Sequence, residues 1–415
     1  MTGETFMRPR SVTILYQTAA RVWLTAAAVS FLLPSRWRAG IWLPLHLVLA
    51  GAISTAISGA MQNFMLTLTA TPAPPGWLVR AQFVLVTMGA ASIAVGVPTS
   101  TAALVAVGGT AFVGGMAILG WMLLRAWRRS LTRRHPFPMA AYGAAVAFVL
   151  IGATFGALIG SGAVSGAAYL RLRHAHQTAN LLGWASLTVV GTLITLLPTV
   201  LRVRMPPRRG RWILVALVGG LVLQLLGWLV PADGLLAAGG VAYAVGAVGV
   251  VGLAVGVLRV QRTWAIPAAG SHMIAAVAWF VLGSLGLARA LLAGPAGFDR
   301  YRSVYLTAFV GGFLVQVLLG AWAYMLPMQR PGHPTDRRRW LAVFELIAPI
   351  QLVLLNGGLA LLAASGAGWL EGRWGEAGWI AAFAGIVLGL AKAWLFPVIA
   401  RGRVETDRAR AVWGS

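Results

Sequence analysis

The chain has 415 residues, of which 59% are hydrophobic and only 10% are charged, and its mean hydropathy is +0.80. Soluble domains carry about 25% charged residues, so this composition excludes a soluble fold and predicts a protein embedded in a lipid bilayer. The formal net charge of +24 comes from arginines in short clusters between apolar stretches, which is typical of membrane topology signals and unlike a nucleic-acid-binding face.

Apolar stretches of about 20 residues, long enough to cross a hydrocarbon core, recur along the whole chain. They predict a single all-α membrane domain, 1–415, with about twelve transmembrane helices. The first stretch lacks a small-residue cleavage site, so we interpret it as a span and not as a signal peptide. The predicted spans are 13–34, 40–66, 77–98, 101–125, 138–160, 176–200, 211–231, 234–258, 268–293, 303–328, 340–364 and 376–398.

The basic loops predict the orientation of these spans. Arginines gather in residues 125–134, 202–211, 330–339 and 401–410, which all lie on one side of the membrane if the N-terminus is cytoplasmic. The loops 98–101 and 231–234 carry few charges and would face outward. The sequence therefore predicts a multi-pass protein of the cell membrane with both termini in the cytoplasm.

An internal repeat relates spans 6 and 10, because a shift of 129 residues superposes polar, glycine and proline positions. The matched pairs are Arg171 and Arg300, Arg173 and Arg302, Thr178 and Thr307, Ala179 and Ala308, Gly183 and Gly312, Gly191 and Gly320, and Pro198 and Pro327. Span 2 joins more weakly, through Arg36 and Arg38 before it and through Gly51 and Gly59, which repeat the eight-residue glycine spacing.

The chain divides into three repeats, which cover residues 13–127, 138–260 and 268–398. Each repeat crosses the membrane four times, an even number, so all three begin on the same side and run parallel. Parallel repeats are related by an axis along the membrane normal. We therefore expect three pseudo-symmetric four-helix quartets; the alternative is a chance match between helices of similar Ala/Gly-rich composition.

Three histidines fall near the outer face in this topology: His46 in span 2, and His174 and His176 at the start of span 6. Imidazole ligates both haem iron and copper, so histidines converging from two helices predict a cofactor site. His174 and His176 point in opposite directions on a helix, and His176 shares its face with Asn180. The alternative is that His174 caps its helix while His176 bonds a neighbouring carbonyl.

Few other polar residues lie inside the spans. Glu345 and Lys392, the only lysine, fall near the cytoplasmic ends of spans 11 and 12, and we expect a structural ion pair; a proton relay is the alternative. Asn180, Gln316, Gln351 and Asn356 are predicted to bond between helices or to line a path. Six paired arginines are predicted to anchor the chain in the interface or to bind lipid phosphate or haem propionates: Arg36, Arg38, Arg171, Arg173, Arg300 and Arg302.

Four segments carry a resemblance to a known family: HAHQTANLLGWASLTVVGTLITLLPTVLRVRM (174–205), LHLVLAGAIS (45–54), GGFLVQVLLGAWAYMLP (311–327) and LLNGGLALL (354–362). They resemble an actinobacterial membrane module that is fused to copper-containing nitrite reductases or multicopper oxidases. That module is in turn distantly similar to haem–copper oxidase subunit I, whose twelve helices form three quartets. The resemblance covers most of the chain.

The chain departs from both relatives. Gln62-Asn63-Phe64 stands where the fused modules often have a second histidine late in span 2, and span 10 offers Tyr305 in place of the oxidase's histidine pair. Span 7 has no histidine, so the comparison implies that no oxygen-reducing binuclear centre can form. The cupredoxin domain of the fused proteins is also missing from this chain.

The leading hypothesis is therefore a redox or metal-handling membrane subunit, with haem b or copper at His46 and His176, that serves a cupredoxin-type copper oxidoreductase. A transporter with a path past Asn180, Gln316 and Asn356 is the second hypothesis, and a cofactor-free scaffold is the third. The sequence leaves open whether the chain is itself an enzyme.

Overall fold

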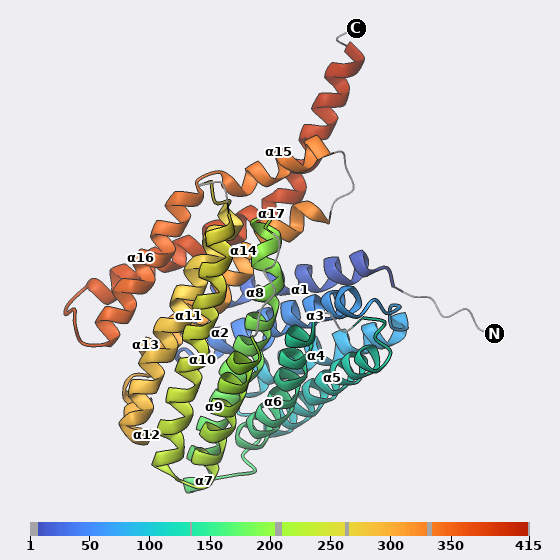
Figure 1. The fold of residues 1–415 in the computed structure, drawn as a ribbon. Helices are drawn as coiled ribbons and strands as arrows, with labels where there is room; N and C mark the ends of the chain where they lie inside the picture. The colour runs from blue at the N-terminus through green and yellow to red at the C-terminus, as the bar shows by residue number, and fades with distance from the viewer. Residues whose placement is uncertain (1–6, 133–134, 204–209, 262–264, 330–333, 414–415) are drawn as a thin grey trace.

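The computed structural model describes residues 7–132, 135–203, 210–261, 265–329 and 334–413, and every regular element in these residues is a helix (Figure 1). Three are π-helices, labelled η. In chain order the elements are α1 (Pro9–Ser30), α2 (Trp42–His46), η1 (Leu47–Ile53), α3 (Ser54–Thr69), α4 (Gly76–Gly96), α5 (Ala102–Arg128), α6 (Pro136–Gly160), α7 (Gly166–Gln177), η2 (Thr178–Ser186), α8 (Leu187–Val200), α9 (Arg211–Leu229), α10 (Asp233–Val260), α11 (Ala268–Leu292), α12 (Gly294–Arg300), α13 (Arg302–Leu306), η3 (Thr307–Val315), α14 (Gln316–Met328), α15 (Pro334–Glu345), α16 (Ala348–Gly366) and α17 (Trp374–Trp413).

Eleven helices in the described residues are long and apolar enough to cross a bilayer, which supports a multi-pass α-helical membrane protein. They match eleven of the twelve predicted spans. The remaining one, 13–34, corresponds to α1, which is not apolar enough to be counted with them. Its polarity has a structural reason, because α1 buries the side chains of Gln17 and Arg21 against other helices.

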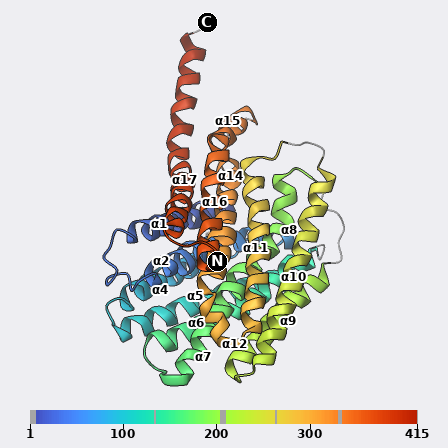
Figure 2. The ribbon, with the colours of Figure 1, turned by 90° about the vertical axis from the view of Figure 1, so that its left-hand side faces the viewer.

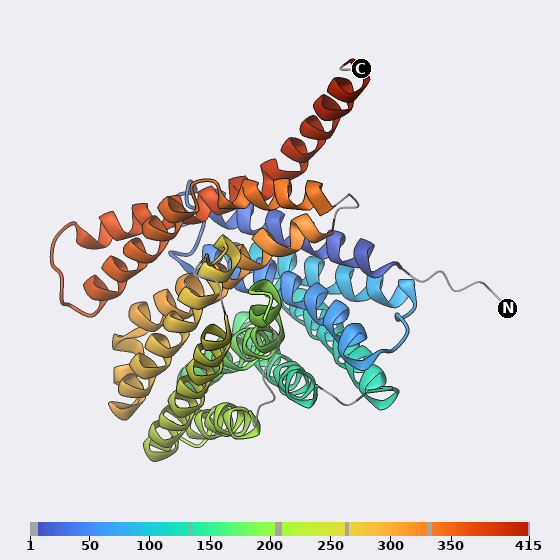
Figure 3. The same ribbon diagram turned by 45° about the horizontal axis from the view of Figure 1, so that its top comes forward.

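The first and last helices lie side by side (Figure 3). The Arg21 Nη1 atom donates to the carbonyl oxygen of Ala393 at 2.8 Å, and its guanidinium lies 4.7 Å from the centre of the Trp394 ring. Gln17 accepts a hydrogen bond of 2.6 Å from the indole of Trp322 on α14. Beyond this contact, the C-terminal part of α17 projects from the bundle (Figure 2).

Two predicted spans have different boundaries in the structure. Span 11 is interrupted where Ile347, with a φ of 52°, separates α15 from α16. This left-handed residue turns the chain, so the polar helix α15 and the apolar helix α16 leave the break in different directions. The apolar part of span 12 ends at Phe396, close to the predicted end, but its helix α17 continues to Trp413.

The three central spans share an unusual feature, since each contains a π-helix. The segments are α2–η1–α3, α7–η2–α8 and α13–η3–α14, and the three π-helices contact one another in pairs. In a π-helix each backbone hydrogen bond spans five residues instead of four, and such segments occur frequently at functional sites. The predicted match of Thr178 with Thr307 falls on the first residues of η2 and η3.

Glycines of the three central spans pack against large side chains of a preceding helix at matching positions. A Cβ atom on Gly51 would lie 2.7 Å from the Trp23 ring, and one on Gly183 would lie 2.6 Å from Phe148. Gly312 meets Trp279 in the same way. Eight residues later the contacts are Gly59 with Tyr16, Gly191 with Ala141 and Tyr142, and Gly320 with His272. The glycine spacing in the sequence thus corresponds to a recurring close approach of two helices.

Candidate functional site

The structure brings His46 and His176 together. His46 ends α2 immediately before η1, and His176 lies in the last turn of α7, two residues before η2. The centres of their imidazole rings are 6.3 Å apart, and the ring planes differ by only 9°. The π-helices η1 and η2 pack against each other. His46 and His176 lie just before these two segments, so their rings come together at the same end of the bundle.

Backbone carbonyl groups determine which nitrogen of each imidazole carries the hydrogen. His46 Nδ1 lies 2.8 Å from the carbonyl oxygen of Trp42, and His176 Nδ1 lies 2.8 Å from the carbonyl oxygen of Gly152 on α6. A carbonyl oxygen can only accept, so each Nδ1 carries the hydrogen and donates it. Each Nε2 atom then keeps its lone pair, which is the arrangement that metal-ligating histidines usually show.

Neighbouring residues hold both rings in place. The Trp42 ring stacks on His46 with a centre-to-centre distance of 3.9 Å. On α6, Gly156 leaves room for the other ring, because a Cβ atom there would lie 2.6 Å from His176 Cε1. The sequence analysis missed these partners, although glycines four residues apart in span 5 are a known signal of close helix packing.

Asn180 supports His176 from the predicted face. Its Nδ2 atom donates to the His176 carbonyl oxygen at 3.0 Å. The same atom lies 3.0 Å from His176 Nδ1, which is a contact between two donors and not a hydrogen bond, because Nδ1 already donates to Gly152. The side chain also lies against Gly152, so Asn180 fills the space beside the ring. We therefore assign Asn180 a positioning role in this arrangement, since its contacts are with the Nδ1 side of the ring.

The ring spacing fits a metal held between the two histidines. The ring centres, 6.3 Å apart, would leave room for one metal ion held by both imidazoles, with metal–nitrogen bonds of about 2.0–2.1 Å. No group of three or more His, Cys, Asp or Glu side chains within the described residues is placed to hold a metal. The protein would thus supply two nitrogen ligands, which suits a haem, whose porphyrin supplies four more, or a two-coordinate copper(I) ion.

His174 belongs to a different cluster. Its ring is buried against Trp228, at 4.5 Å, and Phe298, at 5.2 Å, and its Nε2 atom lies 3.3 Å from Asp299 Oδ1. Arg173 forms a salt bridge with the same carboxylate at 3.0 Å. His174 therefore ties α7 to α9 and α12 and does not cap its own helix, which separates it from the His46–His176 pair. The other part of the structural alternative is present, because His176 does bond to a neighbouring carbonyl, that of Gly152.

The other predicted arginines have local contacts. Arg38 donates to the Gly40 carbonyl at 2.8 Å, Arg171 to the Ala167 carbonyl at 3.4 Å, and the Arg300 guanidinium lies 5.7 Å from the Tyr301 ring centre. Arg36 is exposed beside Arg38, and Arg302 begins α13. Their positions before the central spans suit the predicted interfacial anchoring, and binding of lipid phosphate or propionate stays a prediction.

Glu345 and Lys392 each hydrogen-bond to a helix end, and their opposite charges also act on each other. Both Glu345 carboxylate oxygens accept from the backbone N–H of Ala268, at 3.0 Å, where α11 begins. Lys392 donates to the Phe344 carbonyl at 3.1 Å, in the last turn of α15, and to Gln351 at 2.8 Å. Negative charge at a helix N-terminus and positive charge at a C-terminus are each stabilised by the helix dipole.

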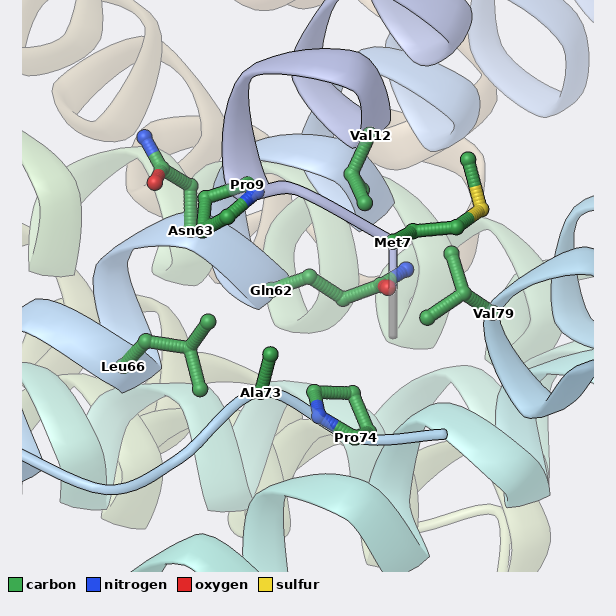
Figure 4. Close-up of a pocket in the computed structure, with 9 residues that line it drawn as sticks. All are labelled: Met7, Pro9, Val12, Gln62, Asn63, Leu66, Ala73, Pro74 and Val79. Atoms are coloured by element: carbon green, nitrogen blue, oxygen red, sulfur yellow. The ribbon is translucent and has the colours of Figure 1, made fainter. Parts of the chain in front are cut away.

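Gln62, at the position where the fused modules often have histidine, takes part in an amide network instead of a metal site. Its Nε2 atom donates to the Tyr16 hydroxyl at 3.0 Å, and Tyr16 bonds to Gln82. Gln62 also borders a shallow hollow, whose other lining residues are nearly all apolar (Figure 4). The lining residues are Met7, Pro9, Val12, Gln62, Asn63, Leu66, Ala73, Pro74 and Val79.

Comparison with known proteins gives no family for this chain. No protein-family model matches the sequence, and no curated protein matches it either. The assignment of a function consequently depends on the geometry of the two histidines and on the fold.

Proposed function

We propose that this multi-pass membrane protein binds a haem b or a copper ion between His46 and His176 and serves electron transfer. One observation carries the proposal: two nearly parallel imidazoles from different spans lie at a ligand-to-ligand spacing, and both Nδ1 atoms donate to backbone carbonyls. Such a bound group would supply one-electron redox chemistry. The protein itself would hold the two Nε2 atoms in register and exclude bulk solvent with Trp42 and α6.

The proposed arrangement of the chain is three quartets of helices about the contact of η1, η2 and η3. The recurring π-helices and the repeated glycine contacts support it. A cupredoxin-type copper oxidoreductase is the proposed electron-transfer partner, and the resemblance in residues 174–205 supports that choice. In this proposal the copper enzyme docks on the membrane face where the histidine pair lies.

An absorption spectrum with metal analysis tests the central proposal. The detergent-purified wild-type protein is measured before and after reduction with dithionite. We expect either a reduced b-type haem band or copper at about one equivalent per chain, because the two histidine nitrogens would hold one centre. A folded protein that is colourless and metal-free after expression with added haem and copper would contradict the proposal and favour a transporter or a scaffold.

The orientation can be tested directly because the chain contains no cysteine. The proposed topology places the histidine pair outside and the basic loops inside. A cysteine at Thr99 is therefore expected to react with an impermeant thiol reagent in intact cells, whereas one at Leu131, which is 82% exposed, should react only after permeabilisation. The reverse pattern would overturn the topology and put the histidine pair on the cytoplasmic side.

A further inference from the structure

Helix α5 exposes one face along most of its length, and that face ends in two arginines. The helix is long and apolar enough to cross a bilayer, and it lies at an edge of the bundle (Figure 1). Its opposite face is buried and includes Met116, Leu119 and Leu123. The exposed residues recur at helical spacing and are Val107, Thr110, Ala117, Trp121, Leu124, Arg125 and Arg128.

The last two turns of this face combine an apolar part with a cationic part. Trp121 and Leu124 are 48% and 46% exposed, and on a spanning helix such side chains contact the acyl chains of lipids. The Arg125 guanidinium lies 5.2 Å from the centre of the Trp121 ring, a cation–π contact that places it directly beside the apolar part. Arg128 follows three residues later and is therefore its neighbour on the helix surface.

The two arginines have no counter-ion in the surrounding sequence. Residues 5–232 contain 18 arginines and neither aspartate nor glutamate. Within the residues that the structure describes, neither the Arg125 nor the Arg128 guanidinium forms a salt bridge. Like charges one turn apart on a helix destabilise it. The negative charge that compensates this pair therefore has to come from a group outside the chain.

The end of α5 is also held in a defined place. The backbone N–H of Leu131 donates to the Thr69 carbonyl at 3.0 Å, and the Ser130 hydroxyl donates to the same oxygen at 3.4 Å. Thr69 is the last residue of α3, so the chain that leaves α5 is tied to the end of a neighbouring span. Arg125 and Arg128 are thus presented by a fixed helix end and not by a loose loop.

We propose that this end of α5 binds an anionic phospholipid. Arg125 and Arg128 bind its phosphate, because a guanidinium can donate two parallel hydrogen bonds to phosphate oxygens. The acyl chains lie along Trp121 and Leu124. A lipid is the occupant because it alone covers both parts of the face, whereas a free anion would leave the apolar part uncovered. The site lies at the other end of the bundle from the His46–His176 pair and does not depend on what that pair binds.

Native mass spectrometry of the detergent-purified protein tests the site. The wild-type chain is titrated with phosphatidylglycerol and with phosphatidylcholine of the same acyl chains. We expect the first phosphatidylglycerol to bind at least about 10-fold more tightly, because each arginine near a membrane surface contributes about 5-fold to the attraction of anionic lipid. The double variant Arg125→Gln/Arg128→Gln should lose about 10-fold in affinity for phosphatidylglycerol.

The double variant Arg8→Gln/Arg10→Gln is the matched control. It removes the same charge from two exposed positions at the start of α1, on the same side of the membrane in the proposed topology. Residues two apart point in different directions on a helix, so this pair cannot grip one phosphate. The control should keep its affinity within about 2-fold. An equal loss in both double variants would overturn the site and show a general attraction of the basic face.

Two measurements on the wild-type protein do not depend on the folding of a variant. A phosphatidylglycerol with a photoreactive diazirine in its acyl chain is expected to cross-link to residues 117–128, as located by mass spectrometry. Cross-links that avoid α5 would contradict the proposal. An excess of soluble glycerol phosphate should leave the bound lipid in place, because it lacks acyl chains. Displacement of the lipid by this soluble anion would show a site for free phosphate instead.

Discussion

Purified protein carrying His176→Ala is expected to lose the proposed haem or copper, and His46→Ala is expected to do the same. Each substitution removes one of the two proposed protein ligands, and no group of three or more His, Cys, Asp or Glu in the described residues offers another site. We expect the affinity for the cofactor to fall by more than about 100-fold. Mutation of residues that only hydrogen-bond to a metal ligand already lowers metal affinity by about 10–100-fold, and removal of the ligand itself should cost more. Metal analysis and the dithionite-reduced spectrum measure the loss.

His174→Ala is the matched control for this experiment. It removes the same side chain from the same helix two residues away, but that ring contacts Trp228, Phe298 and Asp299. The control protein should unfold at a lower temperature, because a buried ring is deleted, yet retain the full cofactor content. Loss of cofactor in both variants, or in neither, would argue against the assignment of His46 and His176 as ligands.

Gly312→Ala should destabilise the bundle by about 1–3 kcal/mol, because the added methyl group meets Cβ and Cγ of Trp279, which lie close to the backbone and cannot swing aside. The matched control is Gly286→Ala on α11, where a Cβ atom would meet no atom within 4 Å. Loss of glycine flexibility alone favours a helix by about 0.5–1 kcal/mol, so the control should be neutral or slightly stabilised.

Thermal unfolding of the two detergent-purified alanine variants decides between crowding and a general effect of glycine replacement. A lower unfolding temperature for Gly312→Ala alone would show that the helix contact is required. If both variants behave alike, the repeated contact of glycine with an aromatic ring is incidental to stability.

The apolar pattern of the sequence was sufficient to predict most of the spans, because length and hydrophobicity alone decide whether a helix can cross a bilayer. It also predicted that span 2 and span 6 would present histidines near one another, and that Asn180 would share the face of His176. These predictions depend only on helical periodicity and on the order of the spans.

Other features depend on contacts that the sequence pattern does not contain. The π-helices η1, η2 and η3 lie in stretches that are apolar on every side. A change of helical period there does not alter the hydropathy pattern of the sequence, so it cannot be predicted from that pattern. The partners of His174 and Lys392 are decided by chain breaks at α12 and α15, where a few residues redirect the backbone. The sequence placed the charges of Glu345 and Lys392 near each other but did not predict that each side chain hydrogen-bonds to a helix end.

The contact between Arg21 and Ala393 has a consequence for biogenesis. The arginine and its carbonyl acceptor are separated by 372 residues, so a chain emerging from a ribosome inserts the first helix long before the last one exists. A cationic side chain in hydrocarbon costs about 2.5–3.5 kcal/mol by insertion scales. In the nascent first helix the guanidinium keeps its bonds to Gln17 and Thr18, but its Nη1 atom lacks the Ala393 acceptor until the last helix has been synthesised.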